Sequence, residues 1–263
     1  MIKAKFIENL RKKFDFSQEQ LAKELGISRP TYVQIEKGER ELTITEAQTL
    51  ASIFNLSLAD LIAGREPAKV EVEFKKSGKR AAVKETSGIR ISIPQERADK
   101  FREALVYILK KVGWKPNFGM AVLYKILYFI DFDYYEKYEE QILGATYIKN
   151  HFGPTPVMFA KIIGTMKEKN EIDEIKSKFY KFDQTRFVVN PEREPDLSDF
   201  SAQEIKHIDD ELEKLSDKTA RELKDYSHRD IPWLTAEEGQ PLDYESVFYR
   251  TDETSVRMYD RED

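Results

Sequence analysis

The sequence predicts a mainly α-helical protein built from two domains and a short connector that carries two β-strands. Apolar residues recur at helical spacing on both sides of residues 65–94, and serine or threonine residues stand at plausible helix starts. Within residues 65–94, two short stretches alternate apolar and polar residues, as half-buried strands do. A chain of 263 residues is also long for one domain and comfortable for two. We therefore expect domains at 1–66 and 97–263, joined by a connector at 67–96.

Composition narrows the classes of protein to which the chain can belong. There is no cysteine, which excludes disulfides, thiolate metal sites and cysteine nucleophiles and fits a reducing cytoplasm. Met1–Phe14 alternates charged and apolar residues, so no signal peptide is predicted. The most apolar run, Met120–Phe132, is too short to span a membrane. We therefore expect a cytoplasmic protein with no membrane contact.

Charge is distributed unevenly along the chain. The net charge is −5, yet Arg65–Lys84 contains seven basic and three acidic residues. The region before it is neutral and the region after it is acidic. Such asymmetry indicates that the parts of the chain have separate roles, and it leaves nucleic-acid binding open despite the acidic total.

The first domain is predicted to consist of successive short helices. Ser17 is a plausible N-cap for a helix that Gly26 ends, and Ser28 is a plausible N-cap for the next helix, which Gly38 ends. Two further N-caps are expected at Thr45 and Ser57. Two short helices joined by a tight glycine-containing turn are typical of a helix-turn-helix, with an ordinary small helical bundle as the alternative.

Particular residues favour the first interpretation. They are Gln18, Leu21-Ala22, Leu25-Gly26-Ile27-Ser28-Arg29 and Ile35-Glu36-Lys37-Gly38. In this order and spacing they closely resemble the Cro/cI-type (XRE) phage-repressor family. The resemblance implies a five-helix, lambda-repressor-like domain whose recognition helix enters the major groove of operator DNA. One such domain binds a half-site weakly, so we expect a homodimer.

The resemblance also assigns roles by position. The residues expected nearest the bases are Ser28, Arg29, Pro30 and Gln34. Arg29 suits guanine and Gln34 suits adenine, whereas Pro30 departs from the polar residue usual in the family and offers only apolar contact. The residues expected on the DNA backbone are Gln18, Thr31, Lys37 and Arg40. Arg11 and Glu36 correspond to a family ion pair that links the first helix to the recognition helix, for which a structural role fits better than a DNA contact.

The connector is predicted to form a short β-hairpin. Lys69–Phe74 and Gly88–Pro94 alternate strictly, and the lysine- and glycine-containing stretch between them favours a turn. The basic residues here either approach DNA phosphates or form a solvated linker, and we favour the solvated linker.

The second domain is predicted to be mostly helical, α+β in class. Apolar stripes mark helices within 101–112, 123–130 and 159–166, the last with Thr155 as its cap and Pro156 at its first position. Ser201–Glu204 is a capping box that opens another helix. Two stretches are expected to be strands: Lys178–Val189 and Tyr244–Arg250.

Catalytic and metal-binding patterns are weak in this domain. The three histidines, His151, His207 and His228, lack the spacing of a metal site. Asp131 and Asp133 point to different faces of a helix and cannot form a carboxylate dyad. We therefore expect no enzyme activity, no metal and no cofactor.

Two ordered blocks carry a second resemblance. The first contains Lys125-Ile126-Leu127-Tyr128, Asp131, Gly144-Ala145-Thr146-Tyr147 and Gly153-Pro154, and the second is Tyr226–Trp233 with its His and Pro-Trp. From Arg97 to Tyr249 the chain resembles the Panacea (SocA-like) antitoxin domain. The family-motif positions are Tyr128, Asp131, Tyr147, His151, Gly153, Pro154, His228 and Trp233. They are either structural or toxin-facing, and a structural role is the commoner one for the tyrosines, His228 and Trp233.

The resemblance implies that this domain neutralises a cognate toxin protein by direct binding, while the first domain represses the operon that encodes the pair. The chain would then be the antitoxin of a type II toxin–antitoxin system. Two alternatives remain open. One is a transcriptional repressor whose second domain senses a small ligand, and the other is a proteolytic adaptor that delivers the toxin to a protease.

Overall fold

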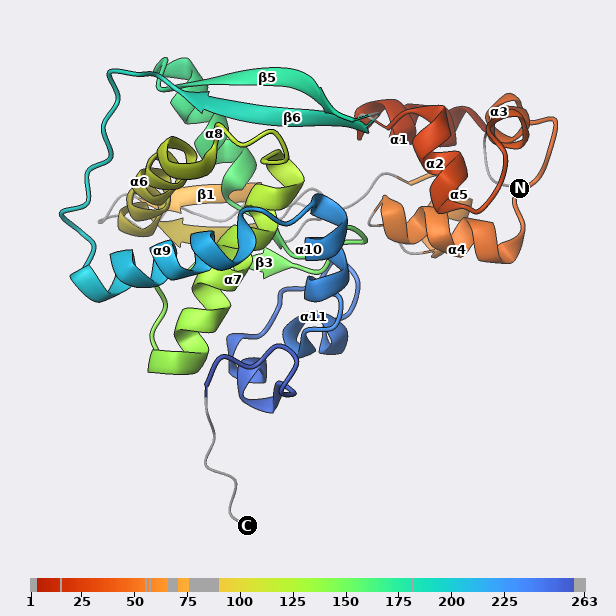
Figure 1. The fold of residues 1–263 in the computed structure, drawn as a ribbon. Helices are drawn as coiled ribbons and strands as arrows, with labels where there is room; N and C mark the ends of the chain where they lie inside the picture. Colours follow the sequence, from red (N-terminus) through yellow and green to blue (C-terminus); the bar gives the residue numbers. More distant parts are fainter. Residues whose placement is uncertain are drawn as a thin grey trace, which may run out of the picture. The chain divides into compact units, whose positions relative to one another are not determined.

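The computed structural model describes residues 4–14, 16–54, 56, 58–65, 71–75, 90–180 and 182–257. Contacts divide the chain into two compact units, Met1–Lys69 and Val70–Asp263 (Figure 1). None of the helices in the described ranges is long and apolar enough to cross a membrane.

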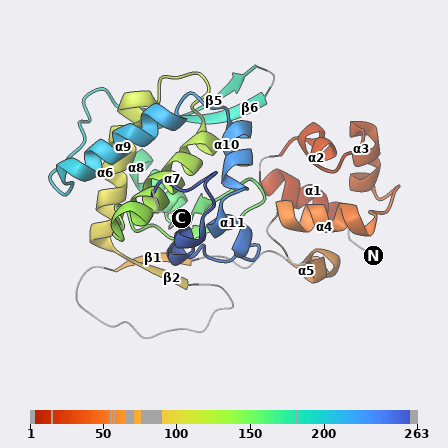
Figure 2. The same ribbon diagram turned by 60° about the horizontal axis from the view of Figure 1, so that its bottom comes forward.

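The first unit contains five α-helices among its described residues (Figure 2). They are α1 (Ala4–Lys13), α2 (Gln18–Glu24), α3 (Arg29–Lys37), α4 (Ile44–Ile53) and α5 (Leu58–Ala63). The buried residues recur at helical spacing, so each helix turns one apolar face inward. Among the residues that fill this core are Leu10, Leu21, Tyr32, Leu50 and Phe54.

Helix ends in this unit follow local sequence rules. Ser17 caps α2 in a capping box with Gln20, and Ser28 caps α3. Gly38 ends α3 in the left-handed conformation, at φ 76°. Thr45 is not a cap, because α4 begins one residue earlier, where Thr43 and Glu46 cap each other reciprocally. Ser57 lies outside the described residues.

The connector contains both expected strands, but they do not form a hairpin. β1 (Glu71–Lys75) and β2 (Arg90–Pro94) pair in parallel, with Glu71 opposite Arg90. Parallel pairing requires the chain to return to the start of the first strand, which takes a connection of about a dozen or more residues. The 14 residues between the strands suffice for that, and they are more than a tight hairpin turn needs.

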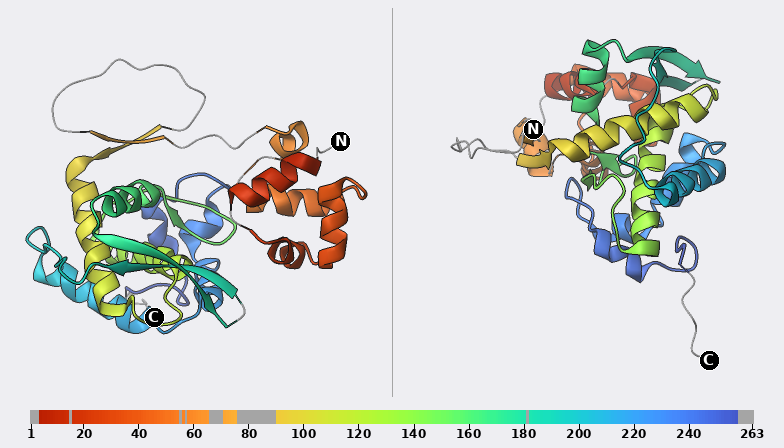
Figure 3. Two further views of the ribbon diagram at one scale, coloured as in Figure 1. Left: turned by 90° about the horizontal axis from the view of Figure 1, so that it is seen from above. Right: turned by 90° about the vertical axis from the view of Figure 1, so that its left-hand side faces the viewer.

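The second unit is built around one long helix, α7 (Met120–Tyr138), which runs through its middle (Figures 1 and 3). Nearly every side chain of α7 from Val122 to Glu136 is buried, so the helix is a core element and not an amphipathic surface helix. The other helices are α6 (Gln95–Val112), α8 (Phe159–Glu168), α9 (Ala202–Leu215), α10 (Ala220–Ser227), α11 (Ile231–Thr235) and the 3₁₀-helix η1 (Tyr244–Tyr249).

Two antiparallel pairs complete this unit. β3 (Tyr147–Ile148) pairs with β4 (Thr155–Pro156), and β5 (Ile172–Phe179) pairs with β6 (Phe182–Val189). The short β3–β4 pair brings the two ends of residues 147–156 together next to α7. The unit is therefore mostly helical with small sheets, as expected from the sequence.

Three expectations for individual elements are wrong. Lys178–Val189 is not one strand, because the chain turns at Tyr180 (φ 53°) between β5 and β6. Tyr244–Arg250 is not a strand, because Asp243 accepts a hydrogen bond from the Glu245 amide and starts η1. Thr155 and Pro156 lie in β4, and α8 begins only at Phe159.

Candidate nucleic-acid interface and buried polar network

The exposed side of α3 carries the residues expected nearest DNA. Tyr32 and Ile35 are buried on the other side of the helix. The exposed residues at or near its start and along its outer face are Ser28, Arg29, Pro30, Gln34 and Lys37. The Ser28 and Thr31 hydroxyls lie 2.7 Å apart, and Ser28 Oγ also accepts a hydrogen bond from the Thr31 amide. The structure thus places these side chains on one continuous surface.

Glu36 ties three helices of this unit together. Arg11 Nε on α1 donates to Glu36 Oε1 at 2.5 Å, so Arg11 and Glu36 form the expected ion pair between the first helix and α3. Gln18 Nε2 at the start of α2 donates to the other oxygen at 2.9 Å, a contact that the sequence did not indicate. The same carboxylate therefore fixes the orientation of Gln18, which is expected to meet a phosphate.

Arg40 is engaged inside the unit. Its guanidinium donates to both oxygens of Glu46, at 3.1 and 2.9 Å, and Glu46 also accepts a hydrogen bond from the Thr43 amide at the start of α4. The pair joins the turn after α3 to the next helix. Arg40, which is expected on the DNA backbone, thus has a carboxylate partner inside the unit, as Gln18 does.

In the second unit, Asp131 on α7 is an anchor for two other segments. Its carboxylate accepts hydrogen bonds from the Leu143 amide (2.7 Å), the Tyr147 hydroxyl (3.0 Å) and the Tyr244 hydroxyl (3.1 Å). Burial raises the pKa of Asp131 to about 6, although these donors act in the opposite direction. Asp131 and Tyr147, both family-motif positions, thus belong to one structural contact.

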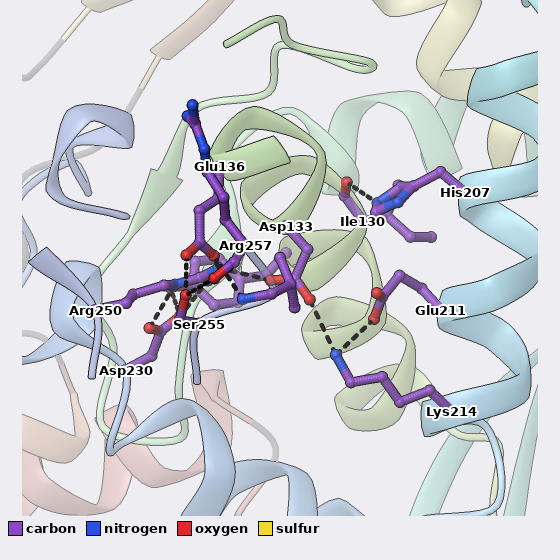
Figure 4. A network of polar contacts seen from close by, with 12 residues as sticks. Ile130, Asp133, Glu136, His207, Glu211, Lys214, Asp230, Arg250, Ser255 and Arg257 are labelled. Atoms are coloured by element: carbon purple, nitrogen blue, oxygen red, sulfur yellow. Dashed lines mark hydrogen bonds and ion pairs between the residues drawn. The ribbon is translucent and has the colours of Figure 1, made fainter. Parts of the chain in front are cut away.

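Arg250 lies at the centre of a second, larger network (Figure 4). Its guanidinium is fully buried and donates to Asp230 at 2.6 and 2.8 Å, to Asp133 at 2.8 Å and to Glu136 at 2.8 Å. The Tyr128 hydroxyl donates to Asp230 at 2.6 Å. Burial opposes the charge on Arg250, but the Asp133 and Asp230 carboxylates raise its pKa well above the usual value.

Sequence reasoning missed Arg250 and Glu136. A usable signal existed, because α7 is apolar all round yet carries three acidic residues, and buried carboxylates require cationic or hydrogen-bonding partners. What the sequence does not indicate is which cation fills that role, since Arg250 lies more than a hundred residues from its partners on α7.

α9 adds a further set of charges beside this network (Figure 4). Lys214 donates to Asp133 at 3.1 Å and to Glu211 at 3.3 Å. Burial and the charge of Asp133 raise the pKa of Glu211 to about 8. The His207 ring contacts the Ile130 carbonyl at 3.0 Å, and burial lowers its pKa to about 4. His207 is therefore a neutral, hydrogen-bonded core residue.

The remaining motif positions meet around residues 149–153. His228 stacks on Trp233, with ring centroids 3.8 Å apart, and Trp233 Nε1 donates to the Asn150 carbonyl at 3.4 Å. Gly153 has φ 111°, a conformation that favours glycine, and both Gly153 and the following Pro154 are buried. His151 is half-buried beside Phe152. The two sequence blocks are thus neighbours in the fold.

The geometry of these groups indicates binding and structural roles. The carboxylates of Asp131, Asp133 and Asp230 are fully buried and saturated with donors, which leaves them no face toward a substrate. Across the described ranges, no group of three histidine or acidic side chains is placed to hold a metal ion. The exposed face of α3 carries the side chains for which the sequence predicts DNA contact.

Comparison with known proteins identifies the two regions. Residues 7–61 match a helix-turn-helix family, and residues 123–234 match the family described as antitoxin SocA-like, Panacea domain. Both resemblances are confirmed, in the predicted order. Two uncharacterized HTH-type transcriptional regulators of Archaeoglobus fulgidus are each 38% identical over 55 residues, which cover 21% of this chain and 78% or 79% of the relative. No solved structure gives a significant match.

Proposed function

We propose that the chain is a type II antitoxin, because it belongs to the helix-turn-helix family and carries a SocA-like Panacea domain after the helix-turn-helix region. The Panacea-like unit binds and neutralises a cognate toxin protein, and the helix-turn-helix unit represses the operon that encodes both. The observation that carries the proposal is the presence of the two regions in one chain, at 7–61 and 123–234. Neither region matches an enzyme family, which supports a function by binding without turnover.

The exposed face of α3 supports the regulatory half of the proposal. The side chains of Arg29 and Gln34, whose donors suit guanine and adenine, are exposed on α3. Gln18, held by Glu36, lies at the start of α2 and is assigned to a phosphate. A homodimer would place two helix-turn-helix units on half-sites about one DNA turn apart.

Neutralisation is tested by co-expression. The neighbouring gene is induced in a sensitive host together with the full chain, with residues 70–263 or with residues 1–69. We expect the full chain and 70–263 to restore growth and to co-purify with the neighbour, and 1–69 to do neither. A toxic neighbour that no version rescues would exclude direct neutralisation.

Repression is tested with the operon's own promoter. Arg29→Ala should weaken specific binding by about 1–3 kcal/mol, because it removes one base contact. Lys12→Ala removes the same charge from α1, where no base contact is assigned, and serves as the control. A gel-shift titration at fixed salt distinguishes the two, and equal losses would contradict the assignment of α3. Growth rescue by Arg29→Ala should be unchanged, since neutralisation is assigned to the other unit.

A further inference from the structure

Lys125 is a buried amine that has no acidic partner among the described residues. It projects from α7, is only 3% exposed, and donates a hydrogen bond of 3.1 Å to the Ala121 carbonyl of its own helix. None of the described carboxylates forms an ion pair with it. Burial, reinforced by the charge of Lys224, lowers the pKa of Lys125 to about 7. In contrast, Arg250 in the same unit is enclosed by three carboxylates.

Other buried polar atoms in this part of the fold also lack a hydrogen-bond partner among the described residues. His228 Nε2 is enclosed and has no hydrogen-bond partner among the described residues, and the same holds for Asn150 Oδ1 and Glu238 Oε1. Burial lowers the pKa of His228 to about 4, and the charges of Lys224 and Lys125 act in the same direction. A Cβ at position 153 would lie 3.1 Å from Lys125 Cε and 3.0 Å from Ser227 Oγ, so Lys125 approaches the residue that precedes His228. Lys224 also lies over the Phe152 ring at 5.0 Å.

The arrangement leaves room for Lys125 and keeps it near the surface. A Cβ at position 153 would lie 3.1 Å from Lys125 Cε, so the absence of a side chain at Gly153 makes space for the lysine side chain. His228, Phe152 and Lys224 are only half-buried, so the cluster reaches the molecular surface. A methionine or leucine would fill the same space without the free-energy cost of burying an amine. Packing alone therefore does not explain a lysine here.

We propose that Lys125, His228 and Lys224 form an oxyanion site between α7, residues 149–153 and α10, which takes one carboxylate or phosphate group. The oxyanion accepts hydrogen bonds from Lys125 Nζ and from His228 Nε2, whose neutral ring donates when the proton is on that nitrogen. It supplies the negative charge that Lys125 lacks in the fold. The proposal concerns this site alone and does not depend on the antitoxin function.

Calorimetric titration of the full chain tests the site with three probes: inorganic phosphate, acetate and a blocked glutamate peptide. Chloride keeps the ionic strength constant. Binding should saturate for at least one probe, and Lys125→Met should weaken it by about tenfold to a hundredfold, because one charge-assisted hydrogen bond is lost. Lys206→Met is the matched control, since Lys206 is exposed and paired with Asp210. It should leave the affinity unchanged.

Proton uptake provides a second readout. At pH 8 most Lys125 is neutral, and an anion favours its charged form, so binding should take up protons in the wild type. The uptake is measured by repeating the titration in buffers of different ionisation enthalpy. His228→Phe, which keeps a ring on Trp233 but removes the Nε2 donor, should weaken binding severalfold and replaces Lys125→Met if that variant does not fold.

The three probes also separate the source of the anion. Binding of phosphate or acetate identifies a free anion as sufficient, whereas binding of the glutamate peptide alone identifies an acidic side chain of a protein. Absence of saturable binding by all three overturns the proposal. An affinity unchanged in both Lys125→Met and His228→Phe overturns it equally. Growth rescue in the co-expression test is measured separately, so failure of this site and failure of the antitoxin function are distinguishable.

Discussion

Arg250 is paired with the fully buried carboxylates of Asp133, Glu136 and Asp230. Three carboxylates with no solvent contact depend on one guanidinium. A buried ion pair adds little net stability compared with apolar residues, but removing one partner leaves uncompensated charge. Loss of Arg250 should therefore destabilise the folded state, even though the ion pairs themselves add little net stability.

Arg250→Met should lower the free energy of unfolding by about 3–5 kcal/mol, because Glu136 and Asp230 lose the cation that pairs with them and Asp133 is left with Lys214. Urea denaturation followed by circular dichroism measures the loss. Arg221→Met is the control, since that side chain is 89% exposed and its pairing with Asp225 is long, at 4.0 Å. A loss no larger in Arg250→Met than in the control would contradict the structural role of the network.

His207 should make the second unit less stable in acid. Burial, reinforced by the charge of Lys137, lowers its pKa from 6.5 to about 4, so the folded state binds the proton less readily than the unfolded state. Its contribution is therefore fully present above pH 6.5 and is lost as the pH falls toward 4, by up to about 3 kcal/mol.

The measurement is the difference in unfolding free energy between wild type and His207→Gln across that pH range. The glutamine amide can still donate to the Ile130 carbonyl but does not titrate. The difference cancels the titration of Asp131 and the other carboxylates, which both proteins share. The wild-type curve should fall more steeply than the variant below pH 6.5, and parallel curves would contradict the interpretation.

Single-residue roles were predictable where they follow from short-range sequence. Ser17, Ser28 and Ser201 act as helix caps because a side-chain oxygen reaches an amide only a turn away. The partners of Asp131 and Asp230 were not predictable, since the contacting residues come from segments far apart in the chain. Tyr128 and Trp233 were expected to be structural, and each makes a hydrogen bond inside the fold.

At the scale of elements, helices were easier to locate than strands. β5 was missed because its polar residues are exposed on both faces of a projecting hairpin, so the sequence shows no clean alternation. β1 and β2 pair in parallel, which requires the chain to return to the start of β1 before β2 begins. The alternation of residues within each strand does not indicate this. η1 was misread because aromatic residues raise strand propensity, while a local Asp243 cap favours a helical turn.

Alanine substitution at two glycines, Gly153 and Gly164, should change stability in opposite directions. Gly153 has φ 111°, and a Cβ there would lie 3.0 Å from Ser227 Oγ. Gly153→Ala should therefore lower stability by about 1–3 kcal/mol. Gly164 lies inside α8, where a Cβ meets nothing within 4 Å, so Gly164→Ala should raise stability by about 0.5–1 kcal/mol. Thermal unfolding of both variants checks the signs, and a stabilised Gly153→Ala would rule out the strain.

At the scale of the whole molecule, the division of contacts predicts independent unfolding. Both tryptophans, Trp114 and Trp233, lie in the second unit, so their fluorescence follows that unit alone, whereas circular dichroism follows both. Leu21→Ala, which empties part of the first core, should lower the stability of the first unit by about 2–5 kcal/mol.

The expected result is a shift in the dichroism transition of the first unit with no change in the fluorescence midpoint. Separate chains of residues 1–69 and 70–263 provide the reference curves. A fluorescence midpoint that moves with Leu21→Ala would mean that the two units unfold as one cooperative body.

The buried guanidinium also has a consequence for how this protein can evolve. Asp133 and Asp230 lie inside the region shared with the Panacea family, whereas Arg250 lies beyond its end. A lineage that loses the arginine would be expected to neutralise or replace the acids that it served, since removing one partner leaves uncompensated buried charge. Among related sequences these positions should therefore change together, and a homologue without the arginine should carry amides or apolar residues in place of the acids.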